Sequence, residues 1–452
     1  MDDQAKALES QSSQVTVLPI DRTGVIGRQL IEPAAPAVVP NDFVVSFPRE
    51  DFPYLEAAAV VNRAGLAWFE AGPHGTRLSA LGDELDLAHA MGAEISKLAP
   101  DQPPFGFGVL AAELPSIVTK ATRERWSKIE ITVSPRSGEA VVTQDPSVLT
   151  GGTPPAMNLF DDLFDDGDKD LDKTDLTLRL ERPSAVVAVD VGEAQTNLHL
   201  ASFRECLAQS KELIVGDGRQ PRYEILEFTD GLAYGGGLNF QFAFEAPTLR
   251  GLDLRLQRSQ VRSLEPLLSL FDPLRPHYSA HGARHYIFTD TRTTIHARIP
   301  ARRHPLAPGD VRSKRPNAEV RIHSTAFREK LKALRTGRGA TSPHQVLHLK
   351  MVDEREPRLE MESRGWSTGK RNARAGDLRP RHADTRFDLL TELALVEKAV
   401  AGCTGEIVLQ PTPDWLYIRK AGTLVKLTVR IRSFLAEAGR LEAQIRSLPK
   451  LI

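Results

Sequence analysis

The stretch AEVRIHSTAFREKLKALR, residues 318–335, decides the fold class because it joins a short alternating segment to an amphipathic one. Its apolar residues Phe327, Leu331 and Leu334 recur at i, i+4 and i+7, which places them on one face of a helix. The residues before Ser324 alternate between apolar and polar, the period of a half-buried strand. Because one apolar stripe has to be buried against another element, this stretch predicts a strand–helix unit packed on a sheet.

The same order of elements occurs three times along the chain. The copies begin at Asp42, Ala185 and Ala318, each with a short strand followed by a helix. Roughly 65 residues after each copy begins a second strand–helix pair, at Phe105, Leu252 and Thr385. Short strands with turn signals lie between and after these pairs. The sequence therefore predicts an α+β fold of six β–α–β units, paired into three domains.

Composition bounds the class of protein. A chain of 452 residues with 41% hydrophobic residues is long enough for several cores. No apolar run approaches the ~20 residues of a membrane span, and the polar, acidic N-terminus does not resemble a secretory signal. The only cysteines are Cys206 and Cys403, so a disulfide scaffold is not expected. We expect an intracellular, cytoplasmic protein without a membrane segment.

Charge is divided unevenly along the chain. Residues 1–175 carry 14 basic and 28 acidic residues, and residues 176–452 carry 44 and 31, which gives −14 and +13. The basic excess is densest over residues 301–350, with 12 basic and 3 acidic residues. Such a division suggests that one part of the molecule faces a polyanion, although uneven surface charge alone would give the same counts.

The domain boundaries follow from composition. Residues 151–176 combine Gly, Pro and a dense Asp run, which favours a flexible linker, and residues 301–316 are rich in Pro and basic residues. The expected organisation is a disordered head (1–40), domain I (41–150), an acidic flexible linker (151–183), domain II (184–303), a basic connector (304–316), domain III (317–432) and a C-terminal extension (433–452).

Three segments carry a resemblance to a known family. They are Thr229-Asp230-Gly231 and Phe288-Thr289-Asp290, each at a turn between strands, and the terminal run RFDLLTELALVEKAVAGCTGEIVLQPTPDWLYIRKAGTLVKLTVRI. Together with the three paired repeats, they make the chain resemble the DNA sliding clamps, the processivity factors of DNA polymerases, over most of residues 42–432. The acidic linker, the head and about 20 residues after the usual end depart from that family's pattern.

The resemblance implies a non-enzymatic homodimeric ring, with sheets outside and helices lining a hole for duplex DNA. Its implied partners are double-stranded DNA, bound without sequence preference, polymerases and repair proteins with short apolar–aromatic motifs, and a clamp loader. Such a protein would be associated with the nucleoid. In this family the partner pocket includes the final strand, which matches Leu427, Val429 and Ile431 here. Period-2 alternation puts these three residues on one face, which could equally belong to the core.

Basic residues beside the apolar helix stripes are the candidates for DNA contact. In the opening stretch, Arg328, Lys332 and Arg335 follow i, i+4 and i+7 next to the buried face. A sliding ring must bind phosphates and not base edges. An ordinary solvated helix face is the alternative explanation. The candidates are Arg328, Lys330, Lys332, Arg335 and Arg338 in domain III, Arg204, Lys211, Arg258 and Arg262 in domain II, and Lys120, Arg123 and Arg125 in domain I.

No short motif predicts catalysis, a cofactor or a metal. His277, His281 and His285 have a spacing that could bind zinc on a helix, but Pro276 precedes them, Gly282 interrupts them and His285 begins an apparent strand. An enzyme without a recognised motif therefore remains a distant alternative. The closer one is a DNA-binding replication or repair accessory protein that docks on a separate clamp. Its docking peptide would be NLFDDLF, residues 158–164.

Overall fold

The structure of the chain is a computed structural model. It describes residues 42–72, 75–96, 105–143, 175–179, 195–214, 223–282, 284–290, 292–306, 319–336, 345–352, 356–365, 371–375, 377–383, 387–421 and 424–434. The predicted head, most of the C-terminal extension, the peptide NLFDDLF, Arg338 and the strand expected from Ala185 lie outside these residues.

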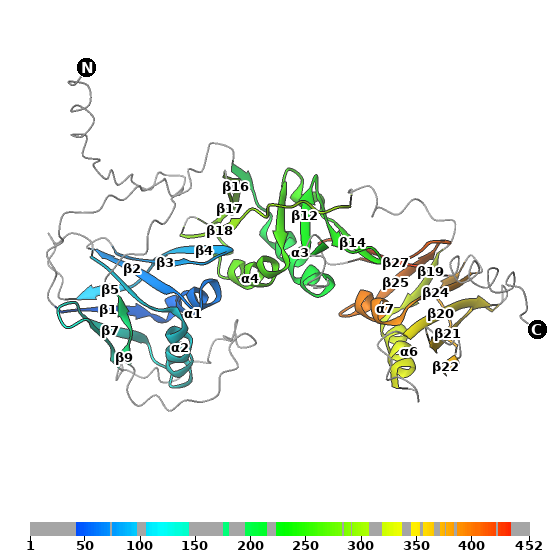
Figure 1. Cartoon of the computed structure of the whole chain (residues 1–452), viewed down its shortest axis with the longest axis horizontal. Coiled ribbons are helices and arrows are strands. Elements are labelled where there is room, and N and C mark those ends of the chain that lie inside the picture. The colour runs from blue at the N-terminus through cyan, green and yellow to red at the C-terminus, as the bar shows by residue number, and fades with distance from the viewer. Residues whose placement is uncertain are drawn as a thin grey trace, which may run out of the picture. The chain divides into compact units, whose positions relative to one another are not determined.

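The first repeat folds as two halves, each a strand, a helix and further strands (Figure 1). The first half has β1 (Phe43–Pro48), α1 (Phe52–Val61), β2 (Leu66–Gly72), β3 (Gly75–Leu81) and β4 (Leu85–Met91), with β5 (Glu94–Ser96) after it. The second half has β6 (Phe105–Leu110), α2 (Leu114–Arg123), β7 (Lys128–Ser134), β8 (Glu139–Thr143), β9 (Asp175–Leu176) and β10 (Leu178–Arg179). Short 3₁₀ turns, Arg49–Asp51 and Ala111–Glu113, precede α1 and α2.

The second repeat has the same order of elements. Its first half has β11 (Gln195–Asn197), α3 (Leu200–Leu213), β12 (Ile225–Thr229), β13 (Leu232–Gly236) and β14 (Phe240–Glu245). A 3₁₀ turn, Pro247–Leu249, leads to the second half, with β15 (Leu254–Gln257), α4 (Arg258–Leu268), β16 (Tyr278–His281), β17 (His285–Thr289) and β18 (Thr293–Arg298). His281 and His285 therefore lie on strands, and no cluster suited to a metal occurs in the described part of the chain.

The third repeat completes the series. Its first half has β19 (Val320–His323), α6 (Ser324–Thr336), β20 (Gln345–Val352), β21 (Arg358–Gly365) and β22 (Arg371–Arg374), followed by β23 (His382–Ala383). Its second half has β24 (Asp388–Glu392), α7 (Leu393–Val400), β25 (Glu406–Pro411), β26 (Trp415–Ala421) and β27 (Lys426–Arg432). All six helices expected from the sequence are present, so the α+β fold of six paired units is confirmed.

One pairing rule holds for every half. The first strand of a half joins the sheet formed by the last three strands of the other half of its repeat, as in the orders β1-β7-β8-β9 and β11-β16-β17-β18. Each helix then buries its apolar stripe against these sheets. In the opening stretch, Phe327, Leu331 and Leu334 are at most 1% exposed. In β1, alternate residues from Phe43 to Phe47 are buried, which matches the period of a half-buried strand.

Last strands join the repeats to one another. β4 pairs antiparallel with β18, and β14 pairs antiparallel with β27, so each junction continues one nine-stranded sheet. The chain forms two compact units, one from the residues up to Leu198 and Ser263–Ile299, the other from His199–Arg262 and Pro300 onward. The middle repeat is thus shared between the units, one half-sheet in each.

The predicted acidic linker needs a correction. Residues 175–179, inside the expected linker of residues 151–183, form β9 and β10, which pair with β8 and β6 of the first repeat. The Asp-rich stretch therefore lies between two strands of the first repeat and does not connect two domains. The side chains of Leu176 and Leu178 are buried, with exposed fractions of 5% and 7%, and their burial helps to hold the segment in place. Two leucines beside an Asp run are too weak a signal for a strand prediction. The other domain boundaries remain predictions.

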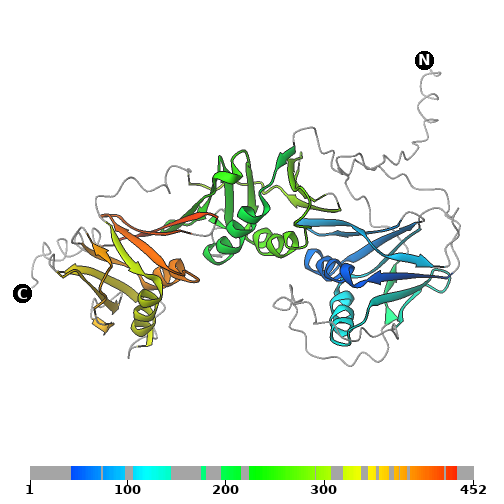
Figure 2. The ribbon, with the colours of Figure 1, turned by 180° about the vertical axis from the view of Figure 1, so that it is seen from behind.

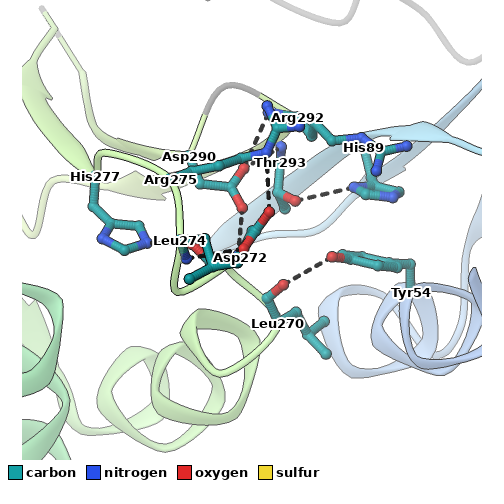
Figure 3. Close-up of polar contacts among 10 residues, drawn as sticks. All are labelled: Tyr54, His89, Leu270, Asp272, Leu274, Arg275, His277, Asp290, Arg292 and Thr293. Carbon is teal, nitrogen blue, oxygen red and sulfur yellow. Dashed lines mark hydrogen bonds and ion pairs between the residues drawn. The ribbon is translucent and has the colours of Figure 1, made fainter. Parts of the chain in front are cut away.

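The junction between the first and second repeats contains a buried polar network (Figure 3). His89 of β4 faces Thr293 of β18, with 3.0 Å between Nδ1 and Oγ1. The Tyr54 ring of α1 stacks on His89 with 3.4 Å between ring centroids, and the Tyr54 hydroxyl donates to the Leu270 carbonyl at 2.8 Å. Asp290 accepts backbone N–H bonds, among them that of Thr293 at 2.7 Å. The junction thus rests on specific polar contacts as well as on backbone pairing.

Candidate nucleic-acid interface

The cations of α6 lie beside its buried face, as the sequence predicts. Arg335 is exposed, and its Nη1 lies 3.8 Å from Glu397 Oε2 of α7. Lys332 is exposed, and Arg328 and Lys330 are half-buried. A cation at the rim of a buried stripe keeps its charge in water while its aliphatic stem covers apolar surface. This face of α6 therefore carries positive charge at the surface of the repeat.

In the second unit, helix α7 lies between α3 and α6 and packs on both of them (Figures 1 and 2). Lys398 of α7 lies within electrostatic reach of Arg258 and Arg262 at the start of α4, and of Glu212 of α3. Burial lowers the pKa of Lys398, and Arg258 and Arg262 lower it further, whereas Glu212 opposes the shift. Three cations and one carboxylate thus lie near one another here, which leaves an excess of positive charge that can attract an anion.

Lys398 is not among the candidate cations predicted from the sequence. It is one basic residue on a helix that also carries Glu397, so neither charge density nor spacing marks it. Its Nζ lies 5.9 Å from the centroid of the Phe240 ring, which holds the side chain toward the neighbouring sheet. The remaining candidates of this unit lie on α3, with Arg204 half-buried and Lys211 exposed.

Among the described helices of the first repeat, α2 carries the candidate cations and α1 carries none. Lys120 is half-buried, and Arg123 and Arg125 are exposed at and just past the C-terminal end of α2. The neighbouring helix α1 carries Glu56 and has no basic residue. The helix α2 packs on α1 (Figure 1). The first repeat therefore presents fewer cations than the other two, in line with its acidic sequence.

The three residues expected to bind partners are part of the core. Leu427, Val429 and Ile431 are 5%, 0% and 0% exposed, and they face Phe244, Phe242 and Phe240 across the pairing of β27 with β14. Their strand is central in a nine-stranded sheet, so the core explanation accounts for their alternation. In this conformation they offer almost no surface, and partner contact at these positions stays a prediction.

The described strands form six similar half-sheets, four of which are joined edge to edge in two pairs, and helices that carry cations pack on them. This arrangement has the fold of solved DNA sliding clamps. No protein-family model and no curated protein matches the sequence. The fold does match solved structures of the DNA polymerase III beta subunit. That of Thermotoga maritima has a TM-score of 0.66 at 10% identity, that of Streptococcus pyogenes 0.65 at 10%, and that of Pseudomonas aeruginosa 0.64 at 11%.

The similarity extends over nearly the whole of these proteins. In each comparison it covers 86% of this chain and 99% of the other. At these identities the likeness establishes the fold. Among the described helices, none is long and apolar enough to cross a membrane.

Proposed function

We propose that this chain is the subunit of a DNA sliding clamp, a non-enzymatic ring that encircles duplex DNA and tethers replication or repair proteins to it. The observation that carries the proposal is the edge-to-edge joining of three repeats with one fold. Each junction uses the last strand of a first half and the last strand of a second half: β4 with β18, and β14 with β27.

The same rule suggests how two copies assemble. Among the described last strands, β22 of the third repeat and β9 of the first repeat have no last strand of another repeat as partner. Pairing β22 of one copy with β9 of a second copy would repeat the two internal junctions. Two such contacts, head to tail, close a dimer and cover the sheet edges formed by β22 and β9. The proposed assembly is therefore a homodimeric ring of six similar domains.

The DNA contacts of this ring would be electrostatic. The cations of α2, α3, α4, α6 and α7 suit phosphate oxygens, which are the same for every base sequence. Polymerases and repair proteins with short apolar–aromatic motifs, and a loader that opens the ring, would be the protein partners. A ring in this role would be cytoplasmic and associated with the nucleoid.

The DNA contact is tested by a salt titration of binding. Each phosphate neutralised contributes about −0.9 to the slope of log affinity against log salt concentration. Replacing Arg328, Lys332 and Arg335 with Ala should therefore flatten the slope by about two to three units, equally on duplexes of different sequence.

A matched control removes the same charge from the sheet side of the same repeat. The control residues are Arg321, Arg379 and Arg381, whose side chains are 49%, 78% and 67% exposed. Their replacement by Ala should leave the slope unchanged. An equal effect of both triple variants would mean that binding follows net charge and not the helix face. Strong preference for one duplex would rule out free sliding.

A further inference from the structure

The last strand of the first repeat changes sheets at a single residue. Its first part, β9, pairs with β8 through Ala140↔Leu176 and Val141↔Asp175. Its second part, β10, pairs with β6 through Leu178↔Val109 and Arg179↔Gly108. Thr177 lies between the two parts. In the proposed ring, β9 pairs with β22 of a second copy. The position of β9 therefore decides whether this sheet edge is ready for pairing.

Thr177 is held by one carboxylate. The Thr177 backbone N–H donates to Glu113 Oε2 at 2.9 Å, and the Thr177 hydroxyl donates to Glu113 Oε1 at 2.8 Å. Glu113 is the residue directly before α2, the helix that carries the candidate cations Lys120 and Arg123. Hydrogen bonds to an ionised carboxylate are roughly twice as strong as neutral ones. We call the Glu113 carboxylate and its two bonds to Thr177 the clasp.

The third repeat shows a similar tie where a junction is already formed. The Thr391 hydroxyl, two residues before α7, donates to the Arg432 carbonyl at the end of β27 at 3.0 Å. The Phe434 N–H donates to the Leu390 carbonyl at 2.9 Å. The strand β27 is paired with β14 over six residues, from Phe240↔Ile431 to Glu245↔Lys426. The joining strand β27 is thus anchored at its end to the segment that leads into the helix of its own half.

We propose that the clasp is the positioning element for ring closure. This proposal rests on the proposed function, because it assigns the clasp to the edge that receives β22 of a second copy. Within the described residues, two residue pairs hold β9 to β8, and we expect β9 to fray from the sheet without the clasp. A frayed edge has to be ordered before a new strand can add, and that cost weakens association. The clasp therefore sets the edge in advance and ties it to α2.

The test uses the full chain with three variants. Thr177→Val removes the hydroxyl bond, Glu113→Ala removes both bonds, and Thr177→Ser keeps both. Sedimentation equilibrium measures the dissociation constant of the dimer, and hydrogen exchange of residues 175–179 is measured at dilution. We expect Thr177→Val to raise the dissociation constant about tenfold, Glu113→Ala to raise it further, and Thr177→Ser to match the wild type.

Hydrogen exchange separates positioning from general stability. Residues 175–179 should exchange at least about tenfold faster in Thr177→Val, whereas β4 and β18 should be unchanged. Faster exchange everywhere would mean that the variant destabilises the repeat as a whole, and it would overturn the proposal. If Thr177→Val forms dimers as tightly as Thr177→Ser, the clasp is not a positioning element, and the ring stands without it. If no form of the chain associates, the proposed ring falls, and the clasp proposal falls with it.

Discussion

At the scale of residues, the junction between the first two repeats buries two titratable groups, and burial shifts their pKa values in opposite directions. Asp51 is 2% exposed, and burial raises its pKa from 3.8 to about 6. His89 is also 2% exposed, and burial and Arg292 lower its pKa from 6.5 to about 3. The closest approach of the two groups is 3.9 Å, between His89 Nε2 and Asp51 Oδ1. At neutral pH the junction therefore contains a neutral imidazole and an ionised, poorly solvated carboxylate.

The pH dependence of stability follows from these directions. Between about pH 4 and pH 6, folded Asp51 keeps a proton that the unfolded chain has lost, so its contribution to stability falls as pH rises. For His89 the unfolded chain binds the proton first, so stability falls as pH drops below 6.5 toward about 3. The two effects oppose each other, and a variant of one group is needed to separate them.

Asp51→Asn should stabilise the protein above neutral pH and have little effect near pH 4. The amide cannot ionise, so the variant avoids the cost of burying a charge, while its carbonyl can still accept the Gly92 N–H bond. A shift of about two pKa units sets a ceiling of about 3 kcal/mol on the gain. Urea unfolding of variant and wild type at several pH values measures the difference. A difference that does not change with pH would contradict the buried-charge account.

At the scale of elements, two neighbouring residues of α6 allow the effects of a substitution on stability and on DNA binding to be measured separately. Leu331 is 1% exposed in the core, whereas Lys332 is exposed on the cationic side. Leu331→Ala should lower the free energy of unfolding by about 2–5 kcal/mol and leave the salt slope of DNA binding unchanged at temperatures where the variant is folded. Lys332→Ala should change stability by less than about 1 kcal/mol and flatten the slope by about one unit.

Unfolding curves and salt titrations on the two single variants measure both effects. If Lys332→Ala loses stability without any change in slope, α6 is a structural helix and does not contact DNA. If Leu331→Ala changes the slope while still folded, the charge count on α6 is not what sets DNA binding.

Elements with strong periodicity could be predicted from the sequence, and elements fixed by distant contacts could not. The helices α6 and α4 follow directly from their apolar spacing. The strands β9 and β10 hold two residues each, and only pairing with β8 and β6 reveals them. His89 and Thr293 are 204 residues apart in the chain, so no local pattern joins them. The positions of the candidate cations were predictable because charge beside an apolar stripe is a local feature, whereas the charges near Lys398 come from α3 and α4, which are distant in the sequence.

At the scale of the whole molecule, the pairing of last strands between repeats supports the proposed ring subunit more than an accessory protein that docks on a separate clamp. The proposed ring makes use of the fold that covers 86% of the chain, whereas docking on a separate clamp would need only a short peptide. The peptide considered for that role, residues 158–164, lies outside the described residues. Among the described strands, two junctions follow one pattern and two last strands, β22 and β9, have no such junction, which fits the proposed closed assembly of identical copies.

Electron microscopy of the purified full chain at micromolar concentration tests this central claim most directly. The account predicts two-chain particles, twice the chain mass of 49.8 kDa, with six similar domains around a central hole. Particles of one chain, or closed particles without a hole, would contradict it.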